Sequence, residues 1–384
     1  MAQWNRVPLI DYIELIGGGT PKTTVPEYWN GNIPWLSVKD FNNDKRYVYS
    51  TEKHISQSGF ENSPTKMLHK DDIIISARGT VGEIAMIPFD MAFNQSCYGI
   101  RASRGIDQPF LYYLLKNCIS QLKRMTHGSV FDTITRDTFA NIEVDIPDAE
   151  TQKRISSVLA DIDNKIEVND AINDNLQQQA AALFSSLYDR SNTEVRFTDL
   201  IQILGGGTPK TGENTYWNGN IAFFTPKDVG IPYTLITEKT ISKEGLSHCN
   251  SRLYPVNTVF VTARGTVGKV GMSGVPMAMN QSCYALVGKE THQLLVYFYT
   301  LKAVDRLKHK ASGAVFDAIT TRDFESEQIM KLSDDDATAF LRVAEPMFQE
   351  VLNNNIENLR LSTLRDSLLP KLMSGEIDVS AVQL

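Results

Sequence analysis

One set of motifs occurs twice along these 384 residues, in the same order. Four of them return at an offset of 186 to 188 residues: GGGTPK at 17–22 and 205–210, YWNGNI at 28–33 and 216–221, ARGTVG at 77–82 and 263–268, and NQSCY at 94–98 and 280–284. HGSVFDTITRD (127–137) is answered by ASGAVFDAITTRD (311–323). A repeat this long is too large for a solenoid. We therefore expect two homologous domains.

Each copy is followed by a segment with the pattern of a long helix. Residues 152–188 contain no Gly and no Pro, and their apolar residues recur in steps of three and four. This spacing forms one apolar stripe, close to a coiled-coil seam, which Asn169 interrupts where a polar residue can fix the register. Such a helix would be roughly 55 Å long and would need a partner. Residues 340–373 carry the matching stripe, so we favour a paired spacer over an ordinary helix of a bundle core.

The motif order predicts four segments. A globular domain covers residues 1–147, a helix 148–190, a second globular domain 191–336, and a second helix with a C-terminal tail 337–384. Each globular domain combines apolar, β-branched runs, typical of buried strands, with one amphipathic helix. The predicted elements of the first domain are strands at 72–77, 82–87, 93–100 and 141–147 and a helix at 108–125. The fold class is therefore α+β: two duplicated domains joined by two long antiparallel helices.

The net charge of −7 argues against nucleic-acid binding only until it is divided along the chain. The two globular parts, 1–146 and 191–332, carry −1 and +3, whereas residues 147–190 and 333–384 carry −4 and −5. The acidic excess thus lies in the helices. Acidic helices disfavour lying along DNA but suit a protein partner, and the globular parts remain free to present basic patches.

The four cysteines show neither C-x-x-C spacing nor a disulfide framework. The first residues lack a cationic segment followed by an apolar one, and no apolar run approaches membrane-spanning length. We therefore expect a reduced, cytoplasmic protein that has no metal site and does not interact with a membrane.

The glycine-rich loops allow two interpretations. GGGTPK lacks the order of a phosphate-binding P-loop, and no G-x-G-x-x-G follows a strand, so a nucleotide site is not expected. The loops are either structural turns or contact a nucleic-acid backbone through Thr20, Lys22, Thr208 and Lys210.

ARGTVG follows a predicted buried strand in each copy. Arg78 and Arg264 occupy the same position in a glycine-flanked turn, beside Thr80 and Thr266. Each arginine either bonds local carbonyl groups to hold the turn, which is the interpretation the sequence alone favours, or makes a bidentate contact to guanine or phosphate.

Two further groups complete the candidate DNA-binding residues. Amides of NQSCY suit adenine edges, although as strand residues they would equally be buried and bonded to the backbone. The predicted helices at 108–125 and 292–310 end in basic residues before a loop of small residues, which suits DNA as well as the helix dipole. The additional candidates are Asn94, Gln95, Asn280, Gln281, Lys123, Arg124, Lys308, Lys310, Ser129, Ser312, Lys39 and Lys227.

No motif predicts catalysis. The chain contains neither a methyltransferase NPP[YF] sequence, nor a P-loop, nor a cluster of metal ligands. PDAETQK (147–153) resembles a nuclease motif only superficially, because its spacing is wrong; Asp148 instead has the position of a helix N-cap. No catalytic, cofactor-binding or metal-binding residue is therefore predicted.

The order of these motifs resembles the specificity (S) subunit of type I restriction–modification systems. The resemblance rests on DIIISARGTVGEIAMI, FNQSCYGI and GSVFDTITRD, then NIEVDIP with the helix after it, and LRDSLLPKLMSGEID at 364–378. It covers essentially the whole chain.

The resemblance implies separate roles for the globular domains, the helices and the partner subunits. Each globular domain would be a target-recognition domain that reads half of a bipartite DNA sequence. The helices would set the spacing and dock two methyltransferase (M) subunits, which would hold the S-adenosylmethionine; restriction (R) subunits would join for cleavage. The chain itself would be no enzyme and would bind no cofactor. One departure is EQIMKLSDDD (327–336), which lacks the Pro of NIEVDIP, and Pro346 is expected to break the second helix or set its start.

A second function class remains open, namely a coiled-coil adaptor whose globular ends bind only proteins. A salt-dependent DNA affinity of the complex with M would separate the two classes, because phosphate contacts release counterions.

Overall fold

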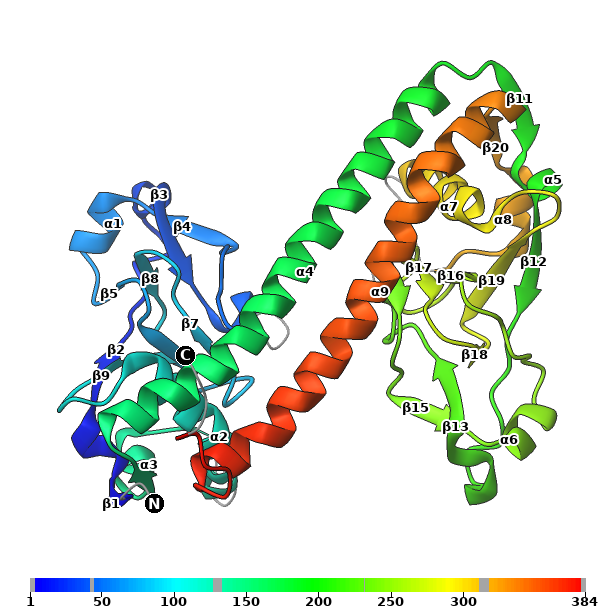
Figure 1. Cartoon of the computed structure of the whole chain (residues 1–384). Helices are drawn as coiled ribbons and strands as arrows, with labels where there is room; N and C mark the ends of the chain where they lie inside the picture. Colours follow the sequence, from blue (N-terminus) through cyan, green and yellow to red (C-terminus); the bar gives the residue numbers. More distant parts are fainter. Residues whose placement is uncertain (1–3, 42–44, 127–132, 231, 311–317, 381–384) are drawn as a thin grey trace. The chain divides into compact units, whose positions relative to one another are not determined.

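The computed structural model describes residues 4–41, 45–126, 133–230, 232–310 and 318–380 (Figure 1). The chain divides into two compact units. Unit 1 contains residues 1–167 and 360–384, and unit 2 contains residues 168–359. Each unit therefore consists of one globular domain together with part of each long helix, α4 (Ala149–Asp189) and α9 (Asp334–Met373).

The described residues of unit 1 form three small sheets. The first is the antiparallel pair β1 (Asn5–Pro8) and β10 (Glu143–Ile146), which joins the start of the domain to the strand before α4. The second is antiparallel, in the order β2 (Ile13–Gly17), β9 (Cys97–Ala102), β6 (Ile73–Ser76) and β7 (Ile84–Met86). The third has the order β4 (Lys53–Ile55), β3 (Trp29–Leu36), β8 (Met91–Phe93) and β5 (Met67–Leu68), with β3 and β8 parallel.

The helices of unit 1 cover these sheets. The longest of the domain is α2 (Gln108–Thr126), and much of its length is buried in the same core as β6 and β9. The shorter helices are η1 (Leu9–Tyr12), η2 (Pro26–Tyr28), η3 (Val38–Asp40), α1 (Gln57–Glu61) and α3 (Arg136–Ala140). Strand β6 is buried on both faces, as its unbroken run of isoleucines predicts.

Unit 2 repeats this architecture. Strands β11 (Thr193–Arg196) and β20 (Gln328–Lys331) form the closing pair. The main sheet has the order β12 (Ile201–Gly205), β19 (Cys283–Gly288), β16 (Val259–Thr262), β17 (Val270–Ser273) and β14 (Tyr233–Thr234). The smaller sheet has the order β15 (Lys239–Ile241), β13 (Trp217–Phe224) and β18 (Met277–Met279). The helices are α5 (Phe197–Leu200), η4 (Asn214–Tyr216), α6 (Lys243–Ser247), α7 (Gln293–Lys310) and α8 (Thr321–Ser326).

The long helices run antiparallel within each unit. In unit 1 the early part of α4 pairs with the end of α9, where Asp163 contacts Arg365. In unit 2 the later part of α4 pairs with the first part of α9, and a layer of amides that includes Asn169, Asn173 and Asn354 joins the two helices. Asn169 is fully buried, so the polar interruption of the predicted stripe lies inside the helix pair. The paired-helix prediction is confirmed, and Asp148 caps α4 as predicted, accepting a bond from the Thr151 amide at 2.9 Å.

Two local predictions were wrong. Residues 93–100 are not one strand, because β8 ends at Phe93, a turn covers residues 94–96 and β9 begins at Cys97. The helix α9 neither breaks nor starts at Pro346; it begins at Asp334 and continues through the proline. Pro346 lies on the exposed face, where water can satisfy the carbonyl that loses its helical bond, while the neighbouring apolar side chains keep the opposite face packed.

Candidate nucleic-acid interface

Three loops that carry predicted site residues meet in unit 1. They are the GGGTPK loop after β2, the ARGTVG turn after β6, and the NQS turn between β8 and β9. The Gly19 amide donates to the Phe93 carbonyl at 3.0 Å, and the amides of Ala77 and Arg78 donate to the Ser96 carbonyl at 2.8 and 3.2 Å. These backbone bonds fix the three loops against one another, so their exposed side chains belong to one surface.

Unit 2 builds the same cluster. The Gly207 amide donates to the Met279 carbonyl at 3.1 Å, and the Ala263 and Arg264 amides donate to the Ser282 carbonyl at 2.8 and 3.2 Å. We call these two groups of loops the loop clusters: residues 18–22, 77–82 and 94–96 in unit 1, and residues 206–210, 263–268 and 280–282 in unit 2. The segments that supply them are distant in sequence and are brought together identically in both copies.

Close backbone approach explains the glycines of GGGTPK. A Cβ added to Gly18 would lie 2.1 Å from the Asn94 carbonyl oxygen, and one added to Gly206 would lie 2.3 Å from the Asn280 carbonyl oxygen. Backbone atoms cannot yield as a flexible side chain can, so any larger residue would push the loop away from the turn. The structural interpretation of these glycines therefore holds, and it is the reason that Thr20 and Thr208 are held in place.

Predicted site residues contact each other in both clusters. The Thr20 hydroxyl donates to Oε1 of Gln95, and the Thr208 hydroxyl donates to Oε1 of Gln281. Gln95 and Gln281 are exposed. This bond orients the side-chain amide of each glutamine. The NH₂ group lies on the other side of that amide and is a donor for which N7 of adenine is an acceptor.

The neighbouring asparagines have a mainly structural role. Oδ1 of Asn94 accepts from the Ser96 amide at 3.1 Å, and Oδ1 of Asn280 accepts from the Ser282 amide at 3.0 Å. This is the side-chain turn that asparagine forms with a backbone amide two residues on. The backbone amide of Asn94 also donates to the Leu36 carbonyl, which connects the turn to β3.

The ARGTVG turn is held by the residue before it, not by its arginine. The buried Ser76 hydroxyl donates to the Thr80 carbonyl and accepts from the Glu83 amide at 2.8 Å. Arg78 is exposed, and its guanidinium has no hydrogen bond or ion pair to any described residue. The local-carbonyl role that the sequence favoured for Arg78 is thus filled by Ser76, which leaves the guanidinium available for a ligand.

Unit 2 shows the same division. Thr262 stands at the position of Ser76, and its hydroxyl donates to the Thr266 carbonyl. The Lys269 amide donates to the Thr262 hydroxyl at 2.9 Å. Arg264 is exposed, and among the described residues its guanidinium makes no polar contact. The Thr266 hydroxyl donates to the Pro226 carbonyl at 3.3 Å, which joins this turn to the segment that carries Lys227.

The lysines fall into two groups. Lys22, Lys39, Lys210 and Lys227 are exposed on or beside the loop clusters, and Lys227 lies 3.6 Å from Glu238. The Lys123 and Lys308 stems instead cover glycines of the turns, since a Cβ on Gly82 or Gly268 would lie 2.6 Å from the lysine Cε.

Lys310 differs from the other predicted cations. It forms an ion pair with the fully buried carboxylate of Glu327, whose other oxygen lies 2.8 Å from Arg306. This pair neutralises a buried charge, so the contact of Lys310 is structural in this unit. Arg124 is exposed at the end of α2, and Ser129 and Ser312 lie outside the described residues.

Asparagines of YWNGNI were missed from the predicted set. Asn30 and Asn218 are exposed and both have φ of 58°, a left-handed conformation at a bulge of β3 and β13. The preceding tryptophans donate to the carbonyls of Lys22 and Lys210 at 3.2 and 3.1 Å, which ties this bulge to the GGGTPK loop. The exact repeat of YWNGNI was the signal that could have identified them.

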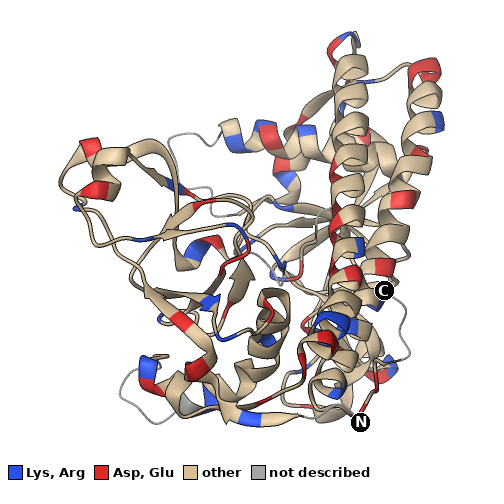
Figure 2. Ribbon diagram, turned by 60° about the vertical axis from the view of Figure 1, so that its left-hand side comes forward, with Lys and Arg blue, Asp and Glu red and all other residues tan. Residues whose placement is uncertain are grey.

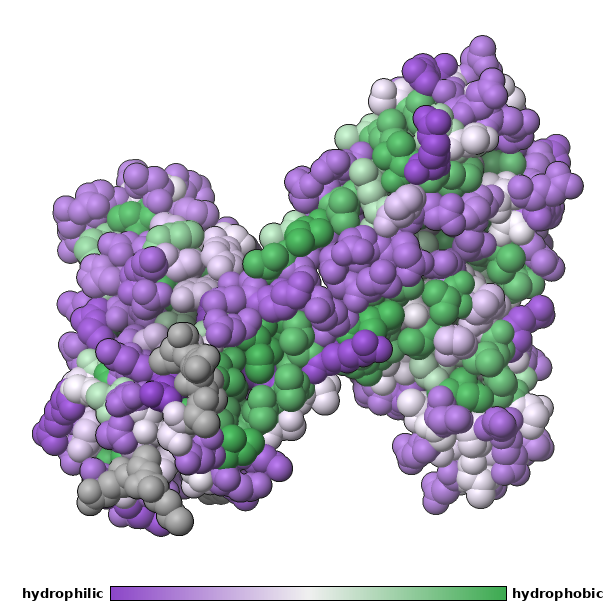
Figure 3. All heavy atoms as spheres, in the orientation of Figure 1, coloured by the Kyte–Doolittle hydropathy of each residue, from purple (hydrophilic) through white to green (hydrophobic). Residues whose placement is uncertain are grey.

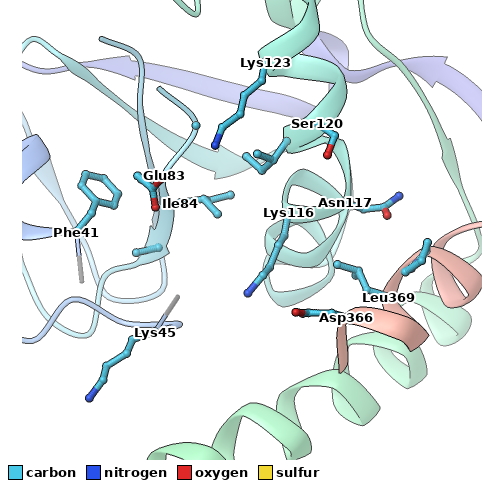
Figure 4. Close-up of a pocket in the computed structure, with 14 residues that line it drawn as sticks. Phe41, Lys45, Glu83, Ile84, Lys116, Asn117, Ser120, Lys123, Asp366 and Leu369 are labelled. Atoms are coloured by element: carbon cyan, nitrogen blue, oxygen red, sulfur yellow. The ribbon is translucent and has the colours of Figure 1, made fainter. Parts of the chain in front are cut away.

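A hollow of about 410 Å³ lies beside the first loop cluster (Figure 4). Lys116 and Lys123 extend into it from α2, opposite Glu83 and Asp366. The residues that line the hollow carry both signs of charge. They include part of α9, so the hollow lies between the basic end of α2 and the helix pair of unit 1.

The thiols of NQSCY do not suit nucleophilic chemistry. Burial, with a smaller effect of the nearby Asp40, raises the pKa of Cys97 to about 12, and burial beside Asp228 does the same for Cys283. Both thiols are thus protonated at neutral pH. Over the described ranges, no group of three or more His, Cys, Asp or Glu side chains is arranged to hold a metal ion. In the same ranges no helix is long and apolar enough to cross a membrane.

Comparison with known proteins identifies the family. The model of the type I restriction modification DNA specificity domain matches residues 1–178 and again residues 190–331. The chain belongs to this family. Both matches cover a globular domain; the first extends through most of α4, whereas the second ends before α9.

Individual members of the specificity family resemble the chain over most of its length. The MjaIX specificity subunit of Methanocaldococcus jannaschii is 24% identical over 98% of this chain and 94% of its own length. The HindI specificity subunit of Haemophilus influenzae is 25% identical over 70% of this chain and 77% of its own. The crystal structure of a type I S subunit from M. genitalium has the same fold, with a TM-score of 0.60, 14% identity and coverage of 97% and 96%.

Proposed function

We propose that each unit reads one half of a bipartite DNA target, in a chain that serves as the DNA-recognition subunit of a type I restriction–modification system. Membership of the specificity family supports the DNA-recognition role. The observation that carries the proposal is the duplicated loop cluster, in which Arg78 and Arg264 are exposed, unpaired within the described residues and fixed by identical backbone bonds.

The chemistry of the loop clusters suits direct readout. A guanidinium can donate to both acceptors of guanine in the major groove. An oriented glutamine amide can donate to N7 of adenine and accept from its N6 amino group. The lysines at positions 22, 39, 210 and 227 would contact phosphates, which position the protein without reading sequence. Preformed turns lower the entropy cost of binding, because the arginine and glutamine start from a fixed backbone.

The long helices would dock the methyltransferase subunits. They are rich in acidic residues (Figure 2) and expose apolar surface as well (Figure 3). Val168, Ile172 and Val343 in unit 2 and Leu364 in unit 1 are each 40 to 53% exposed. Apolar side chains on an otherwise charged helix face are typical of a protein interface. The M subunits would hold the S-adenosylmethionine, and R subunits would join for cleavage. A cytoplasmic location would follow from this assignment.

The test is to express the chain with its methyltransferase partner and to map methylated adenines across the host genome. We expect a single bipartite motif that disappears when the chain is omitted. The purified chain alone should transfer no methyl group from S-adenosylmethionine to DNA. If the partner methylated the same motif without the chain, or if the chain methylated DNA alone, the assignment would be wrong.

The adaptor alternative makes a different prediction. A recognition subunit should give its complex with M a DNA affinity that falls steeply with salt, because lysine and arginine contacts release counterions from phosphates. An adaptor that binds only proteins would leave the salt dependence of M unchanged.

A further inference from the structure

The two units hold their helix pairs together with different chemistry. In unit 1, Asp163 of α4 and Arg365 of α9 form an ion pair with 2.8 Å between Oδ1 and Nη1, and their side chains are only 4% and 6% exposed. The Tyr113 hydroxyl donates to the other carboxylate oxygen at 2.6 Å. Both oxygens of this buried carboxylate therefore have a partner.

The corresponding positions of unit 2 are apolar. An offset of 185 residues relates the helices of the two copies and places Phe348 at the position of Asp163 and Phe298 at that of Tyr113. The position of Arg365 is taken by Ala180. The rings of Phe298 and Phe348 lie 5.5 Å apart, and Ala180 is fully buried in the same core.

The duplication raises the question of which helix pairs with which. We call residues 1–190 the first half and residues 191–384 the second half. If two first halves paired by the same geometry, Asp163 of one copy would lie opposite Ala180 of the other. If two second halves paired, Arg365 would lie opposite Phe348. The first homopair would thus bury two copies of Asp163 with no cation opposite. The second would bury two copies of Arg365 whose remaining carboxylate, Asp366, is 61% exposed.

The amide layer does not make this distinction. Asn169 and Asn173 of the first half correspond to Asn354 and Asn358 of the second. Asn169 donates to Asn358 at 2.8 Å, and Asn354 donates to Asn173 at 2.9 Å. These four amides replace one another in every pairing, so they fix the register of the helices and leave the choice of partner open.

We propose that the Asp163–Arg365 ion pair is a pairing lock, which selects the combination of a first half with a second half and rejects both homopairs. A buried charge that loses its partner is strongly destabilising, whereas the same pair intact is tolerated. Each misplaced charge should disfavour a homopair roughly a hundredfold to a thousandfold. The surface of α4 around Asp163 thus fits α9, in the same molecule or in a second copy of this chain.

The test uses the whole chain, folded before it is cut. A protease site is inserted between Ser191 and Asn192, in the connection between α4 and β11. Chains with two tag lengths are folded, nicked, mixed and allowed to exchange, and the pairs are weighed by native mass spectrometry. We expect first-with-second pairs in every tag combination and homopairs at about 1% or less. Homopairs in the proportion expected from random exchange would overturn the proposal.

The second measurement uses a variant in which unit 1 carries the three residues that stand at these positions in unit 2. The variant Tyr113→Phe with Asp163→Phe and Arg365→Ala gives unit 1 the residues of unit 2, and homopairs should rise at least about a hundredfold. The control Asp366→Asn changes a 61% exposed partner of Arg365 and should leave the pairing as in the unmodified chain. A folded variant without homopairs would contradict the lock; if it does not fold, the unmodified nicked chain still decides.

Discussion

Single residues of the loop clusters separate into those that hold the backbone and those that face outward. Ser76 and Thr262 bond both sides of the ARGTVG turn from buried positions, while Arg78 and Arg264 extend from it. The sequence favoured a bond from each arginine to local carbonyl groups, and no such bond joins the described residues. Polar side chains in tight turns commonly bond local carbonyl groups. Only the structure shows that the hydroxyl of Ser76 or Thr262 makes this bond in place of the arginine.

Replacing Arg78 or Arg264 with alanine should weaken DNA binding and leave stability unchanged. Because neither guanidinium bonds a described residue, its loss should not affect the free energy of unfolding. A lost base contact should cost about 1–3 kcal/mol of binding and relax one position of the target. Fluorescence anisotropy of the complex with M measures the affinity, and thermal unfolding measures the stability.

The matched control is Ser76→Ala, which removes the turn's own bonds. It should lower the free energy of unfolding by about 1–3 kcal/mol, because it removes both hydrogen bonds of the Ser76 hydroxyl, to the Thr80 carbonyl and from the Glu83 amide. A loss of stability in Arg78→Ala comparable to that of Ser76→Ala would show that the arginine is structural.

At the scale of elements, the cap of α4 gives a prediction with a pH dependence. The Thr151 amide and hydroxyl bond the Asp148 carboxylate and lower its pKa below the usual value. A lowered pKa means that the carboxylate contributes stability above the pKa of the unfolded chain and loses it as the pH falls through the folded value. Asp148→Ala should therefore destabilise the chain by about 1 kcal/mol at pH 7.

Asp148→Asn separates the cap from the charge. Asparagine still accepts the Thr151 bond, so this variant should keep most of the stability at pH 7. The difference between the original chain and Asp148→Asn should shrink as the pH falls from about 4, the pKa of an aspartate in the unfolded chain, through the lower pKa of the folded one. Chemical denaturation at pH 7, 5 and 3 measures both effects, and a difference that is independent of pH would argue against the charge.

Elements with strong periodicity were predictable, and elements defined by one or two residues were not. The long helices, α2 and β6 follow from spacing and β-branched runs. The NQS turn could not be predicted, because Phe93 and Cys97 on its two sides continue the apolar pattern of a strand. Pro346 was misjudged because only the packed helix shows that its missing bond faces solvent. The Asp163–Arg365 pair joins residues 202 positions apart and has no local signal.

For the whole molecule, the duplication predicts related half-sites. The loop clusters share Arg78 with Arg264, Gln95 with Gln281 and their backbone bonds, so the two units should read similar bases and give an imperfectly palindromic target. The sequences that differ at equivalent places are TTVPE at 23–27 against TGENT at 211–215, and LSVKDF at 36–41 against FTPKDV at 224–229. Methylome sequencing reports both half-sites, and half-sites with no bases in common would contradict this prediction.

The last prediction concerns the gap between the half-sites, which the two helices should set. Four residues inserted into α4 after Glu167 and four into α9 after Leu359 would fall at the boundary between the units. The Asp163–Arg365 pair would then remain inside one unit and the amide layer inside the other. Four residues add about 6 Å and about 40° beyond a full turn. One base pair adds about 3.4 Å and roughly 35°.

The recognised gap should therefore grow by roughly one or two base pairs, while both half-sites stay the same, because no residue of a loop cluster has changed. Insertion into α4 alone is the matched control; it shifts one helix against the other and should weaken the pair instead of giving a clean new gap. Methylome sequencing of each variant decides the outcome. Altered half-sites, or an unchanged gap with full methylation, would show that these helices do not measure the distance.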